Sequence, residues 1–262
     1  MRLSHTAALG VVQGLTEFLP ISSDGHLSLL QILWKMGPGM LTLDIWLHVG
    51  TLFSILVYFR NDWLALWNAL SRGDSPEGMW TRRDIVLIVV ANVPTALIGL
   101  LLKGSVDSAV TSMAAVGLGF LVTAVFLSWG QRRLSMGPGA LPRTPFWHAA
   151  LIGVVQGLAV WPGWSRSGTT IATALLLGWS GERAARFSFI IAVPAIMGAT
   201  LLNALDTSLQ IDGATGLGMA VSFGVGCLAL SILMRSLSLK KLWPFALYCF
   251  CLSAVSFWFS IP

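Results

Sequence analysis

Long apolar stretches separated by short polar ones make up most of this chain. Several of them are about 20 residues long, which is the length of α-helix that crosses about 30 Å of hydrocarbon. They cover residues 41–60, 84–103, 110–129, 184–204, 214–234 and 243–261. The pattern therefore predicts six membrane-spanning helices.

Two further apolar regions, 7–34 and 147–179, are each interrupted by a polar segment that contains proline and glycine. The interruptions lie at 20–25 and 162–168. The pieces on either side are about 11–15 residues long, or about 16–22 Å of helix, which is too short to cross a bilayer. Non-helical backbone at membrane depth is tolerated only where protein buries it or where it lines a wet cavity. We therefore expect two re-entrant helix pairs, each entering the membrane, turning near the midplane and leaving on the same side.

The two interrupted regions are copies of each other. The sequence Gly-Val-Val-Gln-Gly-Leu at 10–15 recurs unchanged at 153–158, and the same offset pairs Ser22 with Ser165 and Gly25 with Gly168. Three predicted spans follow each copy, and an odd number of crossings turns the second half upside down. The expected fold is an all-α polytopic membrane protein with an inverted-topology repeat, each half one re-entrant helix pair plus three transmembrane helices. The chain forms a single membrane domain over 1–262, with repeat 1 at about 1–134 and repeat 2 at about 135–262.

The composition excludes an ordinary soluble domain. The chain is 55% hydrophobic and only 10% charged, whereas soluble domains carry about 25% charged residues. The net charge of +5 comes from basic residues in short loops, which is typical of topology signals rather than of a nucleic-acid interface. We therefore expect membrane lipids, and no nucleic acid, as partners. The cysteines, Cys227, Cys249 and Cys251, all lie in apolar runs without disulfide or metal-ligand spacing.

The basic residues also predict an orientation. Most of the sixteen Lys and Arg residues fall in loops on one side: Arg60, Arg72, Arg82, Arg83, Arg132, Arg133, Arg143, Arg183, Arg186, Arg235, Lys240 and Lys241. The other side holds Arg2, Lys35 and Lys103. The richer side should be cytoplasmic, so we expect both termini and the first re-entrant pair to face outward.

The polar residues of the two interruptions are the candidates for chemistry. They are Glu17, Ser22, Ser23, Asp24 and His26 in one copy and Ser165, Arg166, Ser167, Thr169 and Thr170 in the other. Ionisable groups at membrane depth are costly and usually functional, and two helix N-termini would direct their N–H groups at a common point. The pattern predicts a site for a multiply charged phosphate.

Structural alternatives exist for each of these residues. Glu17 and Arg166 would also suit an ion pair that joins the repeats, the serines would suit helix N-caps, and His26 alone would suit a core position. His48 and His148 lie outside both copies, and we expect no role for them.

Both interruptions resemble the signatures of a known family. Residues 13–26, Gln-Gly-Leu-Thr-Glu-Phe-Leu-Pro-Ile-Ser-Ser-Asp-Gly-His, are similar to the first signature of the undecaprenyl-diphosphate phosphatase (bacitracin-resistance) family. Residues 162–170, Pro-Gly-Trp-Ser-Arg-Ser-Gly-Thr-Thr, are similar to the second, and segment order and length agree over the whole chain. Gln13 stands where many members have Glu, and Asp24 replaces a commonly neutral residue.

The resemblance implies an integral phosphatase of the bacterial inner membrane that hydrolyses undecaprenyl diphosphate to undecaprenyl phosphate and phosphate. It would recycle the lipid carrier for peptidoglycan synthesis and give bacitracin resistance. Because the lipid diphosphate is released outside the cell, the site should open toward the periplasm. A homodimer, the preferred lipid chain length and the product's movement across the membrane stay open.

The expected catalytic residues are Glu17, Ser23, His26 and Arg166. Arg166 should hold two phosphate oxygens with its planar guanidinium. Ser22, Gly25, Ser165, Ser167, Gly168 and Thr170 should complete the phosphate cradle. Glu17, with Gln13, should hold a divalent cation, Mg²⁺ or Ca²⁺, since both prefer oxygen ligands. The nucleophile is either Ser23 or a water, activated by His26 or Glu17.

Two other functions compete with this interpretation. Inverted repeats with broken helices are also the design of secondary transporters, and a lipid flippase is a variant of that design. The two polar interruptions carry more chemical groups than passage requires. A phosphatidic-acid-type phosphatase would need a second catalytic histidine after a Ser-Arg pair, and none of His5, His48 and His148 is so placed.

Overall fold

The computed structural model describes residues 3–34, 40–74, 79–139, 144–206 and 212–260, and every regular element in these ranges is an α-helix. The helices are α1 (Leu3–Phe18), α2 (Ser23–Leu33), α3 (Met40–Tyr58), α4 (Arg60–Arg72), α5 (Arg82–Ala109), α6 (Met113–Met136), α7 (Phe146–Leu158), α8 (Arg166–Leu176), α9 (Gly181–Asp206), α10 (Gly213–Ser238) and α11 (Trp243–Trp258). Three of the basic residues used to predict orientation, Arg2, Lys35 and Arg143, lie outside the described ranges.

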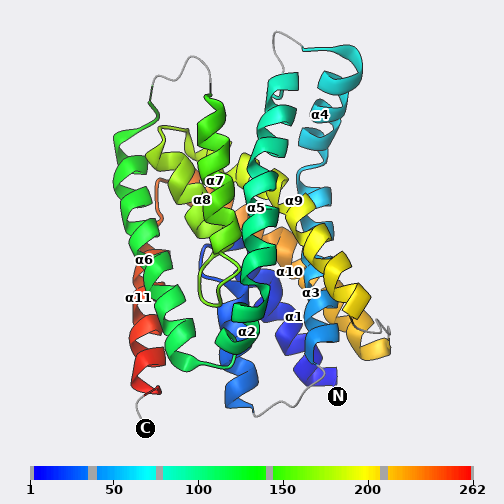
Figure 1. The fold of residues 1–262 in the computed structure, drawn as a ribbon, viewed down its shortest axis with the longest axis vertical. Helices are drawn as coiled ribbons and strands as arrows, with labels where there is room; N and C mark the ends of the chain where they lie inside the picture. The colour runs from blue at the N-terminus through cyan, green and yellow to red at the C-terminus, as the bar shows by residue number, and fades with distance from the viewer. Residues whose placement is uncertain (1–2, 35–39, 75–78, 140–143, 207–211, 261–262) are drawn as a thin grey trace.

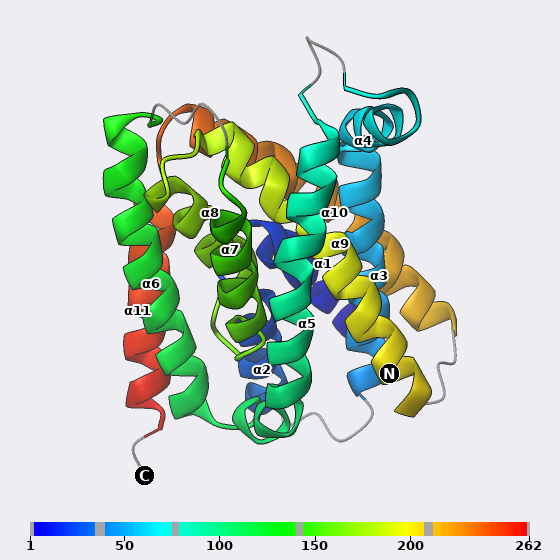
Figure 2. The ribbon, with the colours of Figure 1, turned by 45° about the horizontal axis from the view of Figure 1, so that its top comes forward.

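The structure confirms the two re-entrant pairs. Helix α1 enters the bundle from the end at which α11 finishes, and α2 returns to that same end (Figure 1). Helices α7 and α8 enter and leave from the opposite end, and the two turns meet inside the bundle (Figures 1 and 2). We call the end that holds the start of α1 and the finish of α11 the terminal end, and the end that holds α4 the basic end. The opposed pairs are those of an inverted repeat.

Helices occupy all six predicted spans. By length and apolar composition α5, α6, α9 and α10 can each cross a membrane, and α3 qualifies together with α4, from which it is bent by 68°. Helix α11 has 16 residues, or about 24 Å, which is less than the hydrocarbon thickness of about 30 Å. The predicted span at 243–261 was therefore too long, because the helix ends at Trp258.

Helix α4 was not predicted, because its charged ends were assigned to a loop. It is amphipathic, and its exposed face carries Leu64, Trp67 and Leu70. On its buried face, Asp62 accepts hydrogen bonds from Trp80 Nε1 at 2.8 Å and from Arg186 Nη1 at 2.6 Å. The bond from Arg186 holds α4 against the N-terminal part of α9, and the bond from Trp80 holds it against the segment that leads into α5.

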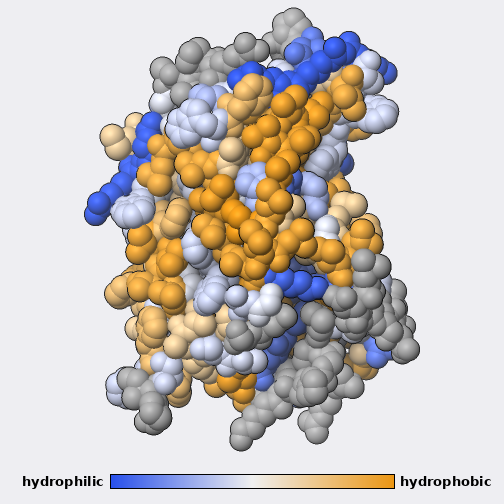
Figure 3. Space-filling view, viewed as in Figure 1, coloured by the Kyte–Doolittle hydropathy of each residue, from blue (hydrophilic) through white to orange (hydrophobic). Residues whose placement is uncertain are grey.

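Ion pairs continue across the basic end. Arg183 of α9 pairs with Asp84 of α5, and the Arg83 guanidinium donates to the Thr144 carbonyl. On the face that the space-filling view shows, apolar residues cover much of the middle and hydrophilic residues gather toward the basic end (Figure 3). This distribution fits a bundle that spans a bilayer.

Equivalent helices of the two repeats pack in equivalent ways. Helix α1 packs on α10, and its copy α7 packs on α5. In each case the glycines of the repeated Gly-Val-Val-Gln-Gly-Leu sequence face the partner backbone, which lets the helices approach closely. The duplicated sequence therefore makes the same kind of helix contact in each half and brings both turns to the centre.

Candidate active site

The two turns of the re-entrant pairs, residues 19–26 (the first tip) and 159–168 (the second tip), lie directly against each other. A Cβ atom added to Gly25 would come within 2.7 Å of the Gly163 Cα, and one added to Gly168 would lie 3.1 Å from the Pro20 Cβ. Side chains at these positions would force the tips apart. Glycine at Gly25 and Gly168 therefore serves the contact between the tips.

Serine side chains cap the helix that leaves each tip. Ser22 Oγ accepts from the Gly25 N–H at 3.3 Å, and Ser165 Oγ accepts from the Gly168 N–H at 3.1 Å. Helix α2 therefore starts at Ser23 and α8 at Arg166. This is the N-cap role that the sequence allowed as an alternative. Substrate binding by Ser22 and Ser165 stays a prediction.

The carboxylate of Glu17 joins the two repeats. Its Oε1 forms an ion pair with Arg166 Nη2 at the start of α8, while its Oε2 accepts from Ser23 Oγ at 2.6 Å and from Gln13 Nε2 at 3.2 Å. The Glu17 side chain is 7% exposed and that of Arg166 is 15% exposed. The structure thus brings together four of the residues that the sequence selected, from three helices.

Two polar atoms of this group lack a hydrogen-bond partner among the described residues. They are Gln13 Oε1 and Arg166 Nη1, and both are buried. A buried polar atom without a partner costs free energy of about 1–3 kcal/mol, and more for a charged group. One atom is an acceptor and the other a cationic donor, so together they suit a ligand that brings a cation and an anionic oxygen.

The hydroxyls of α8 bind one another and a neighbouring helix. Ser167 Oγ lies 3.4 Å from Ser165 Oγ. Thr170 Oγ1 donates to the Arg166 carbonyl at 2.7 Å and lies 2.6 Å from Ser188 Oγ on α9. Ser188 was not predicted, since a serine inside an apolar span gives little signal. Thr170 thus links the backbone of Arg166, in the first turn of α8, to Ser188 on α9.

His48 lies beside this group, although it falls outside both interruptions of the sequence. Its Nδ1 donates to the Asp44 carbonyl at 2.8 Å, which turns Nε2 toward two carboxylates. Nε2 lies 3.7 Å from Glu17 Oε2 and 3.4 Å from Asp24 Oδ1. A histidine inside a predicted membrane span was the available signal. His148 instead accepts from Trp179 Nε1 at 3.1 Å, away from the tips.

The His26 ring contacts the Ser22 backbone and Tyr248 of α11. Its Nδ1 donates to the Ser22 carbonyl at 2.7 Å, and its Nε2 lies 2.7 Å from the Tyr248 hydroxyl. Both ring nitrogens are therefore engaged elsewhere, while Glu17 accepts the Ser23 hydroxyl proton. Of the two activating groups that the sequence left open, this geometry favours Glu17.

Comparison with known proteins places the chain in a family. Residues 6–255 match the family model described as bacitracin resistance protein BacA. The chain belongs to this family. It is 43% identical to the undecaprenyl-diphosphatase of Desulfosudis oleivorans, over 95% of this chain and 96% of that protein. It is 38% identical to the undecaprenyl-diphosphatase of Desulforapulum autotrophicum, over 98% of each chain.

The donor atoms near Gln13 fit a divalent cation that is shared with a phosphate. Mg²⁺ in phosphoryl-transfer sites is commonly held by one or two carboxylates together with phosphate oxygens and water. The unpaired Gln13 Oε1 and the adjacent Glu17 carboxylate supply oxygen donors of this kind. Within the described ranges, no group of three or more His, Cys, Asp or Glu residues is placed to hold a metal ion by itself.

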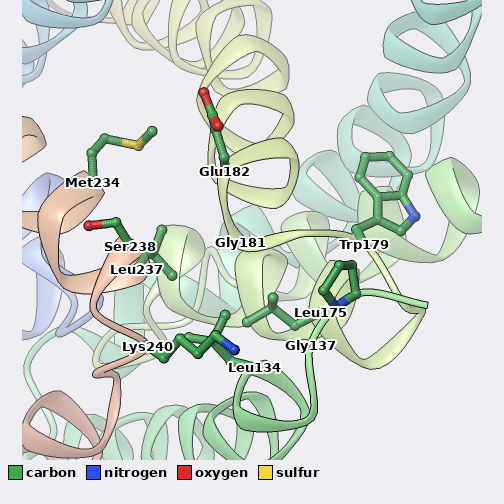
Figure 4. A pocket seen from close by; sticks show the side chains of 11 residues that line it. Leu134, Gly137, Leu175, Trp179, Gly181, Glu182, Met234, Leu237, Ser238 and Lys240 are labelled. Atoms are coloured by element: carbon green, nitrogen blue, oxygen red, sulfur yellow. The ribbon is translucent and has the colours of Figure 1, made fainter. Parts of the chain in front are cut away.

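A cavity of about 320 Å³ lies elsewhere, at the basic end between α6, α8, α9 and α10. Glu182, Trp179, Met234 and Lys240 are among its lining residues (Figure 4). None of the residues of the two tips lines it. We therefore place the candidate active site at the tips and not in this cavity.

Proposed function

We propose that the chain is an integral membrane phosphatase that hydrolyses undecaprenyl diphosphate to undecaprenyl phosphate and phosphate. In a bacterium it would recycle the lipid carrier for cell-wall synthesis and lower sensitivity to bacitracin. The observation that carries the proposal is the group around Glu17, in which a serine hydroxyl donates to a buried carboxylate beside an arginine with an unpaired Nη1. A flippase or transporter needs no hydroxyl bound to a base.

The arrangement supports in-line transfer of the terminal phosphoryl group. Arg166 Nη1 donates to oxygens of that group while Nη2 stays on Glu17. Ser23 Oγ attacks the terminal phosphorus and passes its proton to Glu17. The bond from phosphorus to the bridging oxygen breaks, and its electron pair leaves on the prenyl phosphate. Water then attacks the phosphorus of the phosphoserine, the bond to Ser23 Oγ breaks, and Glu17 returns its proton to that oxygen, so that phosphate is released and both residues are regenerated. Catalysis of this kind depends mainly on positioning and electrostatics.

Gln13 and Glu17 are the residues that would hold a Mg²⁺ or Ca²⁺ ion. A bound cation of this kind neutralises charge on the transferring phosphoryl group. A His48 that carries hydrogen on both ring nitrogens would place a positive charge close to Glu17 and Asp24. Its part in the proposal is to hold these two carboxylates beside the substrate.

Phosphate release by detergent-purified protein tests the proposed activity. We expect release from undecaprenyl diphosphate, a loss of at least about tenfold with a chelator, and recovery on adding Mg²⁺ or Ca²⁺. Undecaprenyl monophosphate is the matched control and should release none. Absence of release from the diphosphate would refute the activity, whereas release that a chelator leaves unchanged would refute the metal site alone.

The proposed location is the bacterial inner membrane, with both termini and the mouth of the site on the periplasmic side. The basic residues at the other end support this orientation. Side-chain exposure rises from 7% at Glu17 to 23% at His48 and 48% at Asp24, and α2 continues from Asp24 to the terminal end. At the basic end, the ion pairs of Arg183 and Arg186 tie the helices together. The prenyl tail would leave sideways into the lipid.

Labelling of single cysteines tests this orientation. Two carboxylates serve as a matched pair: Asp24 at the first tip, 48% exposed, and Glu182 at the basic end, 60% exposed. In a background without Cys227, Cys249 and Cys251, an impermeant thiol reagent should label Asp24→Cys in intact cells and Glu182→Cys only after lysis. The opposite result would invert the topology. Labelling of Asp24→Cys from both faces would favour the transporter or flippase alternative.

A further inference from the structure

The backbone of the first tip adopts a strained conformation directly before the proposed nucleophile. Ser22 has φ 70° and ψ 104°, and among the described non-glycine residues only Ser22 and Lys240 have positive φ. A non-glycine residue keeps such backbone angles only where surrounding contacts hold it in place. The position of Ser23 Oγ therefore depends on whatever fixes Ser22.

His26 supplies one such contact. Its Nδ1 donates to the Ser22 carbonyl at 2.7 Å, which fixes the peptide group between Ser22 and Ser23. Only a ring that carries hydrogen on Nδ1 can make this bond, because a carbonyl oxygen has no proton to donate. A neutral His26 must then have its lone pair on Nε2.

Tyr248 selects this form of the ring. Its hydroxyl lies 2.7 Å from His26 Nε2, so the O–H can donate to the Nε2 lone pair and leave the hydrogen on Nδ1. The two rings are stacked with their centroids 5.6 Å apart and their planes at 2°. The Phe120 ring also contacts the imidazole, with the centroids 5.4 Å apart and the planes at 85°. The ring is thus held in both its orientation and its tautomer.

We propose that Tyr248 is a positioning residue for the phosphatase reaction, acting through His26 and the Ser22 carbonyl to hold Ser23 in place for attack. The role rests on the proposed function above. Tyr248 lies on α11 in the second repeat, whereas Ser22, Ser23 and His26 belong to the first, so the hydroxyl ties the nucleophile to the helix that ends the bundle. Diphosphate binding by Arg166 does not pass through this chain of contacts.

The test substitution is Tyr248→Phe, which keeps the stacked ring and removes only the hydroxyl. Tyr58→Phe is the matched control, since Tyr58, at the end of α3, is the other tyrosine of the chain and its ring contacts that of Phe59. For undecaprenyl diphosphate, Tyr248→Phe should lower kcat about tenfold, the effect of one hydrogen bond, and leave KM within about twofold. The side-chain ¹⁵N shifts of His26 should move toward a mixture of tautomers. The control Tyr58→Phe should change neither the kinetic constants nor the ¹⁵N shifts of His26.

Substitutions of His26 keep the proposal testable if Tyr248→Phe folds poorly. His26→Asn places an amide donor near the position of Nδ1, whereas His26→Gln places one near Nε2. The His26→Asn variant should therefore keep a higher kcat than His26→Gln. Adding Tyr248→Phe to His26→Asn should cause no further loss of kcat. An unchanged kcat in well-folded Tyr248→Phe, a loss confined to KM, or a higher kcat in His26→Gln would each overturn the role of Tyr248. A parent protein that releases no phosphate would instead refute the proposed function.

Discussion

Replacing Arg166 by lysine should lower phosphate release about 10³-fold while the protein still inserts and folds. The guanidinium can bind Glu17 through Nη2 and present Nη1 to the phosphate at the same time. An ammonium is a compact point charge that cannot reproduce this planar, two-sided geometry. In Arg166→Lys the lysine would stay with Glu17 and leave the phosphate oxygens without their donor.

Steady-state phosphate release, together with the thermal unfolding midpoint in detergent, measures this effect. Arg186→Lys is the matched control, because Arg186 is also paired with a buried carboxylate and is 23% exposed against 15% for Arg166. The control should keep a rate within about threefold of the parent, since Arg186 lies at the basic end. A near-parental rate for Arg166→Lys would remove Arg166 from the site.

Glu17→Gln should also lower phosphate release about 10³-fold, which is within the usual range for loss of a general base. The amide is close in size to the carboxylate, but it cannot take the Ser23 proton, and it leaves Arg166 without its counter-ion. The concentration of Mg²⁺ or Ca²⁺ needed for half-maximal activity should rise in the same variant. Both changes follow from the single carboxylate that contacts Ser23, Arg166 and Gln13.

Glu182→Gln serves as the control for that substitution. Its carboxylate is 60% exposed and pairs with Arg186 on the next turn of α9, so its loss should leave the rate unchanged. A Glu17→Gln enzyme with the parental rate would show that Glu17 serves only as the ion pair between the repeats. If Glu17→Gln is slow but needs the same concentration of Mg²⁺ or Ca²⁺ for half-maximal activity, Glu17 acts as a base and not as a metal ligand.

Much of the architecture could be predicted because its causes are local. The length of an apolar run decides whether a helix can cross, and a proline- and glycine-containing break at membrane depth requires a protected turn. The recurrence of 10–15 at 153–158 indicated the duplication, and three spans after each copy indicated the inversion. The residues that meet at Glu17 could be selected because charged and hydroxyl side chains at that depth are costly.

The tertiary structure alone decided which groups meet and what each one does. His48 reaches Glu17 from α3, and Tyr248 reaches His26 from 222 residues away. Such contacts depend on how helices pack across the bundle, which neither periodicity nor spacing records. The same packing placed His26 against Tyr248 of α11 and bent α4 onto α9 through Asp62. The local sequence pattern identified the polar residues at the tips. Which side chains they contact depends on the close packing of other helices around the tips.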